Sequence, residues 1–134
     1  MFSIFRFFKK PKTTPNTKNP DPSKEINILD LHFLYQEKIE TYYREREKPG
    51  YLDMAVSACK DQISIAPAAS KAFKEEEGWQ PGHKGYNQLA IIFEKEGRFQ
   101  EAINLSQQAK SQGWDGDWDK RIARCDNKLK KEKP

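Results

Sequence analysis

The residues best suited to nucleophilic catalysis in this 134-residue chain are its two histidines, His32 and His83. A nucleophile needs a base within reach, and neither histidine has a serine or cysteine at a spacing that implies such a pair. The sequence also contains no glycine-rich phosphate loop and no HExxH zinc motif. We therefore expect two structural histidines in a protein that is not an enzyme and uses no cofactor.

One acidic segment, residues 115–119, has the composition of a calcium-loop start. A calcium loop requires glycine at its centre, where this chain has Lys120, and the residues from there onward have helical spacing. Acidic side chains at the start of a helix are the simpler interpretation, because they cap its free N–H groups. We expect no metal site.

The two cysteines, Cys59 and Cys125, are too few and too far apart for a disulfide framework or a CxxC clip. Both lie on apolar helix faces, so we expect buried, reduced thiols. Thiols of this kind indicate a reducing compartment, and the predicted location is cytoplasmic.

The apolar residues from Ile26 onward recur at steps of three and four, which is the spacing of amphipathic helices. Ser23 or Asn27 is the expected cap of the first helix. No segment shows the period-two alternation of a half-buried strand, so the predicted fold class is all-α. The expected helices cover residues 25–47, 52–66, 68–77, 83–96, 99–112 and 117–131.

Length and charge predict one domain with an N-terminal tail. The chain is shorter than a typical domain of about 150 residues. Residues 1–24 carry six Lys/Arg against one Asp, residues 25–119 carry 11 against 17 Asp/Glu, and residues 120–134 carry seven against two. Because four of the eight prolines fall within 11–24, we predict a flexible Phe/Lys-rich tail and Pro-rich linker over 1–24 and a helical domain over 25–134.

The first ten residues are almost all aromatic or basic, and they need a surface on which to dock. Three surfaces remain open: an anionic membrane, a groove of a partner, and the concave face of the chain itself. A single short segment gives only weak membrane attachment. A peripheral membrane-associated adaptor anchored by this N-terminus is one alternative function. The candidate docking residues are Phe2, Phe5, Phe7 and Phe8.

A local pattern occurs twice: residues 50–55 and 97–102 each have a glycine, an apolar residue two positions later and an alanine three beyond that. Glycine ends one helix in a tight turn, and alanine lets two antiparallel helices approach closely. The two alanines, Ala55 and Ala102, are 47 residues apart. A regular array of this kind has a period of 34, and the short third helix with its connector accounts for the excess.

These residues make the chain resemble the tetratricopeptide repeat (TPR) family, with one good repeat at 83–114 and one degenerate repeat at 36–67. The chain departs from the family's pattern at Ser106 and Trp114 in the good repeat, and at Arg46 and Cys59 in the degenerate one. The resemblance implies a right-handed stack of antiparallel helical hairpins, an α-solenoid fragment with a C-terminal capping helix. The matching positions are Tyr86, Leu89, Ala90, Phe93, Gly97, Phe99, Ala102 and Ala109, with Gly50, Leu52, Ala55 and Pro67 in the weaker repeat.

What the resemblance implies for function is a non-catalytic protein-protein interaction module, an adaptor that binds a peptide or helix of another protein in a concave groove. Carried onto this sequence, the groove residues are Lys84, Asn87, Ile91, Glu94 and Lys95, with Glu37, Glu40, Arg44 and Glu47 on the weaker hairpin. A solvated helix face is the plainer interpretation of each of these residues. The oligomeric state is left open.

The last predicted helix carries a basic stripe that keeps a second alternative open, a nucleic-acid accessory protein. The basic residues of a nucleic-acid binder usually follow one face of the fold, whereas here they gather at the two ends of the chain. Nucleic acid is therefore an unfavoured partner. The stripe consists of Arg121, Arg124, Lys128 and Lys131.

The tryptophans Trp79, Trp114 and Trp118 are expected to fill the core or the connectors.

Overall fold

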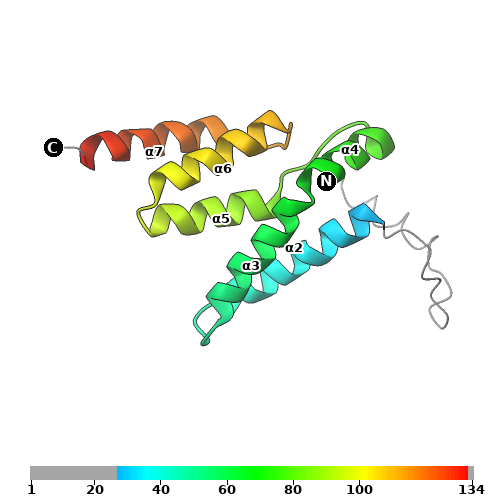
Figure 1. Ribbon diagram of the computed structural model, residues 1–134, viewed down its shortest axis with the longest axis horizontal. Helices are drawn as coiled ribbons and strands as arrows, with labels where there is room; N and C mark the ends of the chain where they lie inside the picture. Colours follow the sequence, from blue (N-terminus) through cyan, green and yellow to red (C-terminus); the bar gives the residue numbers. More distant parts are fainter. Residues whose placement is uncertain (1–26, 133–134) are drawn as a thin grey trace.

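The computed structural model describes residues 27–132, and its regular elements are six helices (Figure 1). Within this part of the chain, extended pairing is limited to one isolated bridge between Gly82 and Asp115. The all-α prediction is therefore confirmed for the residues described. The helices are α2 (Ile28–Arg44), α3 (Tyr51–Ser64), α4 (Ala66–Glu77), α5 (Lys84–Lys95), α6 (Phe99–Ser111) and α7 (Trp118–Glu132).

Neighbouring helices pack as hairpins. The first hairpin is α2 with α3 and the second is α5 with α6, while α7 packs along α6. Figure 1 shows α5, α6 and α7 side by side, with the first hairpin tilted against them. The two hairpins meet where α5 packs on α3 and α2, and α4 packs mainly on α2.

The first helix is shorter than the predicted 25–47 at both ends. Asn27 is its cap, because the Asn27 side-chain oxygen accepts hydrogen bonds from the backbone N–H groups of Leu29 at 2.9 Å and Asp30 at 3.2 Å. The helix ends at Arg44. The residues that follow form a turn that leads to Gly50, which has φ of +81°, a conformation that glycine adopts without strain.

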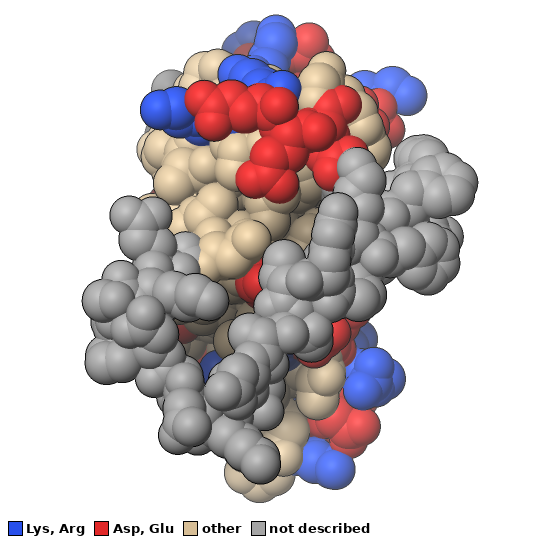
Figure 2. All heavy atoms as spheres, turned by 90° about the vertical axis from the view of Figure 1, so that its right-hand side faces the viewer, with Lys and Arg blue, Asp and Glu red and all other residues tan. Residues whose placement is uncertain are grey.

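The short third helix predicted between the two hairpins is present as α4. Pro67 lies in its first turn, where proline lacks only an N–H that would have no partner in the helix. Its last turn is acidic, with Glu75, Glu76 and Glu77 in sequence. Figure 2 shows the side of the molecule that is on the right in Figure 1, and acidic side chains gather at its upper end, where Figure 1 places α4.

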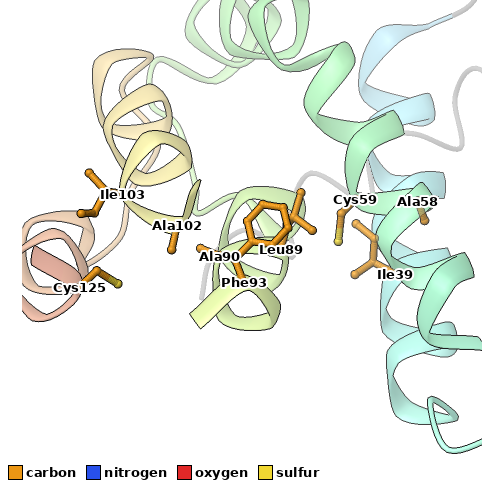
Figure 3. Packing of buried hydrophobic residues seen from close by; sticks show 9 residues of the cluster. All are labelled: Ile39, Ala58, Cys59, Leu89, Ala90, Phe93, Ala102, Ile103 and Cys125. Carbon is orange, nitrogen blue, oxygen red and sulfur yellow. The ribbon is translucent and has the colours of Figure 1, made fainter. Parts of the chain in front are cut away.

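The apolar core runs across both hairpins. Figure 3 shows its buried side chains following one another from the first hairpin through α5 to α6 and α7. Both cysteines lie in this core as buried free thiols, as predicted. Burial raises the pKa of the Cys59 thiol to about 12, so this thiol stays protonated. The core consists of Ile39, Ala58, Cys59, Leu89, Ala90, Phe93, Ala102, Ile103 and Cys125.

A second apolar cluster, rich in aromatic rings, joins α4 to both hairpins. Trp114 and Trp118 are buried in it, as predicted, whereas Trp79 lies in the connector after α4 and is 39% exposed. The imidazole of His32 stacks on Trp114, with ring centroids 5.8 Å apart and an interplanar angle of 4°. His83 also contacts Trp114, at 4.7 Å between centroids. Both predicted structural histidines are thus core residues.

One buried amide side chain, that of Gln62 on α3, links three helices. Its nitrogen donates to the backbone oxygen of His32 on α2 at 2.9 Å, and its oxygen accepts from the backbone N–H of Gly85 on α5 at 2.7 Å. A Cβ atom at Gly85 would lie 2.9 Å from that oxygen and 3.0 Å from the carbonyl oxygen of Cys59. Glycine is therefore required where α5 meets α3.

Replacing Gln62 with methionine, which has a similar volume, should lower the free energy of unfolding by about 1–3 kcal/mol. The reason is that the buried N–H of Gly85 in the first turn of α5 loses its partner, while the carbonyl oxygen of His32 loses a hydrogen bond that it accepts in addition to the helical one. Urea unfolding followed by circular dichroism measures this change. The matched control is Gln107→Met on the exposed side of α6. If the two variants are equally stable, Gln62 does not join the helices as described.

Candidate functional site: the face of α2, α5 and α7

A cavity of about 360 Å³ opens between α2, the start of α5 and the connector from α6 to α7. Its volume falls in the range of small-ligand pockets and peptide side-chain pockets. Helix α2 contributes Gln36, and α5 contributes Lys84 and Asn87. The connector contributes Asp115 and Gly116, and Trp118 lines the cavity from the start of α7.

The cavity includes two of the five groove residues predicted on α5. Lys84 and Asn87 line it, so these two predicted groove residues lie together on one side of α5. Ile91 is half-buried, and Lys95 is exposed near the other end of α5. Glu94 is held by α7, as described below, rather than left open to a partner.

The residues predicted on the first hairpin do not line this cavity. Glu37, Glu40 and Arg44 are exposed on α2, and Glu47 lies in the turn beyond the end of that helix. The α2 residue at the cavity is Gln36, which the sequence analysis missed. The sequence offered no signal for Gln36, because neighbouring residues lie about 100° apart around a helix and the predicted Glu37 therefore points to a different side of α2.

Glu94 of α5 is clamped by two arginines of α7. The Nε and Nη2 atoms of Arg124 donate to its two carboxylate oxygens at 2.8 Å each, and Arg121 Nε donates at 3.1 Å. Hydrogen bonds from Arg124 and then from Arg121 lower the pKa of the Glu94 carboxyl to about 2, against the opposing effect of burial. Arg121 also donates to the amide oxygen of Asn87 at 3.1 Å. Helix α7 therefore forms one wall of the site.

This clamp uses part of the basic stripe that favoured nucleic acid. The guanidinium groups of Arg121 and Arg124 neutralise a carboxylate of their own chain, and the Arg121 side chain is only 12% exposed. The ammonium of Lys128 lies over the ring of Phe99, 5.6 Å from its centroid. Phosphate groups attract arginines that are free to approach them. The stripe is thus a weaker phosphate surface than the sequence indicated.

At the far end of the face, α2 and α5 are joined by Tyr43 and Lys95. The Lys95 ammonium donates to the Tyr43 hydroxyl at 3.3 Å, and Arg46 lies over the same ring with its guanidinium carbon 4.2 Å from the centroid. Both cations are exposed. A cation over an aromatic ring contributes about 0.5–1 kcal/mol at an exposed site, so this contact stabilises the packing of α2 against α5 only weakly.

His83 fixes the start of α5, the edge of the cavity. Its Nδ1 atom accepts a hydrogen bond from the backbone N–H of Tyr86 at 3.0 Å, which caps the helix. Burial, together with the neighbouring His32, lowers the pKa of the His83 imidazole to about 3. Only the neutral ring has a free lone pair on Nδ1, so the cap requires the unprotonated form.

The described residues, 27–132, contain no group of three or more His, Cys, Asp or Glu side chains that could hold a metal ion. None of the six helices combines the length and the apolar character that crossing a membrane requires. The proposed docking residues Phe2, Phe5, Phe7 and Phe8 lie outside the described part of the chain, as do the predicted tail and linker over 1–24. Comparison of the chain with protein-family models, curated proteins and solved structures gave no match.

Replacing Glu94 with glutamine should lower the free energy of unfolding by about 1–3 kcal/mol, because charged hydrogen bonds to partly buried arginines become neutral ones. Urea unfolding at pH 7 measures the change. Glu101→Gln is the matched control, since Glu101 also pairs with an arginine, Arg98, but on an exposed surface. The control should change little. Equal effects of the two substitutions would contradict the clamp.

Stability should fall as the pH drops from 6.5 towards 3, because the unfolded chain protonates His83 near its ordinary pKa of 6.5 while the folded chain does not. The His83 contribution to this loss is about 2 kcal/mol at pH 5. Urea titrations at pH 7 and pH 5 measure it. His83→Asn, which keeps a capping side chain without a titrating ring, should lose about 2 kcal/mol less over this interval. The prediction is wrong if both chains lose the same amount.

Proposed function

We propose that this chain is a non-catalytic protein-interaction module, an adaptor whose face of α2, α5 and α7 binds an extended peptide or a helix of another protein. The observation that carries the proposal is the cavity at the start of α5, with Gln36, Lys84 and Asn87 along it. Amide side chains both donate and accept, so they suit a peptide backbone. Lys84 and Asp115 add one charge of each sign.

Rigid support for these side chains favours binding over a merely solvated surface. Gln62 and His83 fix the start of α5, and the clamp on Glu94 fixes α7 against α5. Binding loses less free energy when the recognising side chains are already held in place. The cavity is thus part of a preorganised surface rather than a gap between loosely packed helices.

The proposal includes a TPR-like stack as the architecture. Support comes from the residues that carry the resemblance: Tyr86, Leu89, Ala90 and Phe93 are buried along α5. Ala102 is buried on α6. In such a stack the first helix of each hairpin lines the concave groove, which agrees with a site between α2 and α5. The insertion of α4 between the hairpins departs from a regular array. The reduced, buried cysteines fit a cytoplasmic location.

Selection of peptides from a random displayed library on the full chain tests the proposal. Selected peptides should bind Lys84→Glu at least tenfold more weakly than wild type, which corresponds to about 1.4 kcal/mol. Isothermal titration calorimetry measures the affinities. Lys71→Glu is the matched control, because Lys71 is exposed on α4, away from the cavity. The groove assignment fails if no peptide is selected, or if Lys84→Glu and Lys71→Glu bind alike.

A further inference from the structure

The outer face of the first hairpin carries two of the three exposed large hydrophobic residues of the described chain. Leu34 on α2 is 46% exposed and Met54 on α3 is 37% exposed, while the third, Trp79, lies in the connector after α4. A shallow cavity of about 200 Å³ lies between these helices, and Tyr42, Met54 and Ala58 contribute its apolar lining. This surface is separate from the cavity at the start of α5.

A row of three apolar residues and one lysine leads along α2 into this shallow cavity. Leu31, Tyr35, Lys38 and Tyr42 follow one another at steps of four, three and four, so they share one side of the helix. Leu31, Tyr35 and Tyr42 are each only half-buried. An end hairpin of a repeat stack must hide its outer face from water, which other arrays achieve with a capping segment. The row with Leu34 and Met54 is called the outer apolar face below.

We propose that residues 2–8 of the same chain cover the outer apolar face as an N-terminal cap. These seven residues contain five bulky apolar side chains, and Arg6, Lys9 and Lys10 supply three positive charges in or next to them. The face offers an aromatic and aliphatic surface of matching kind. The proposal does not depend on the peptide-binding function.

Charge at the rim of the outer apolar face favours this occupant. Asp61 lines the shallow cavity. Asp53 is exposed in the first turn of α3, and Glu37 is exposed one turn after Leu34 on α2. Lys38, which belongs to the row and lines the cavity, and Lys60, exposed on α3, are the cations of this region, so three carboxylates face two ammonium groups. Attraction between this rim and the basic side chains of residues 1–10 adds to the apolar contact.

The length of the intervening chain permits the contact. Residues 11–24 span about 40 Å when extended as polyproline, at about 3.1 Å per residue. The distance along α2 from Asn27 to Tyr42 is about 22 Å, at 1.5 Å per residue. Residues 2–8 can therefore reach any point of the outer apolar face without displacing α2.

Cysteine cross-linking in the full chain tests the proposal. Ser3→Cys supplies one thiol, and Ser57→Cys, a residue that lines the shallow cavity, supplies the other. The control pair combines Ser3→Cys with Ser111→Cys at the end of α6. Ser111 lies next to Gln112, which contacts α4 through Ser70 at 3.1 Å, and Ala109 packs in one cluster with Leu29 at the start of α2. An undirected N-terminus would meet Ser111 at least as often as Ser57.

The disulfide between positions 3 and 57 should form at least about tenfold faster than the control disulfide, because docking raises the effective concentration at one site only. The native Cys59 and Cys125 are fully buried and do not compete. Adding Leu34→Glu should reduce the rate to that of the control, and the exposed position of Leu34 makes this change harmless to folding. Equal rates for the two pairs would overturn the proposal.

Two other occupants give different outcomes. A second copy of the chain would produce intermolecular disulfides between positions 3 and 57, with a rate that rises with protein concentration. A membrane would make the wild-type chain float with vesicles containing phosphatidylserine, and removal of residues 1–10 would abolish flotation. Either result would overturn intramolecular capping. The expected results are a rate that is independent of concentration and a wild-type chain that does not float.

Discussion

The structure depends on one buried side chain, the amide of Gln62, which satisfies a backbone acceptor on α2 and a backbone donor on α5 from its place on α3. An amide has both a donor and an acceptor group, so one residue can hold two backbones that run past each other. The contact also needs Gly85, because any side chain there would press on Gln62 and on the backbone of α3. These hydrogen bonds have fixed partners and directions, unlike apolar contacts, so they hold the two hairpins in one register where α3 meets α5.

This fixed register explains where the candidate site lies. His83 and Lys84 directly precede Gly85, so the Gln62 contact positions both the cap of α5 and the first cation of the cavity. At the other end, Glu94 holds α7 against α5 through two arginines. The backbone of α5 between these two points is therefore held in place, which favours recognition by a preformed surface. The buried aromatic and histidine rings behind the cavity make it firm.

The two surfaces of the first hairpin differ in chemistry, and this difference separates their roles. The side that faces α5 ends in a cavity with amide and charged groups, which suits a peptide that must be released. The opposite side carries Leu34, Met54 and a row of half-buried aliphatic and aromatic residues. A surface of that kind gains free energy by being covered permanently. A cap supplied by the same chain would leave the α5 side open to a partner.

The sequence alone determined the helices, because apolar spacing, caps and glycines act within a few residues of each other. It located the six helices of the described residues and the buried histidines and cysteines. It extended α2 to residue 47, because the turn before Gly50 has no strong stop signal of its own. The place of Gln36 at the cavity, and the clamp of Arg121 and Arg124 on Glu94, were decided only by the tertiary structure. These contacts join residues at least 27 positions apart, and they depend on how each helix is rotated and crossed against its neighbour, which local spacing does not encode.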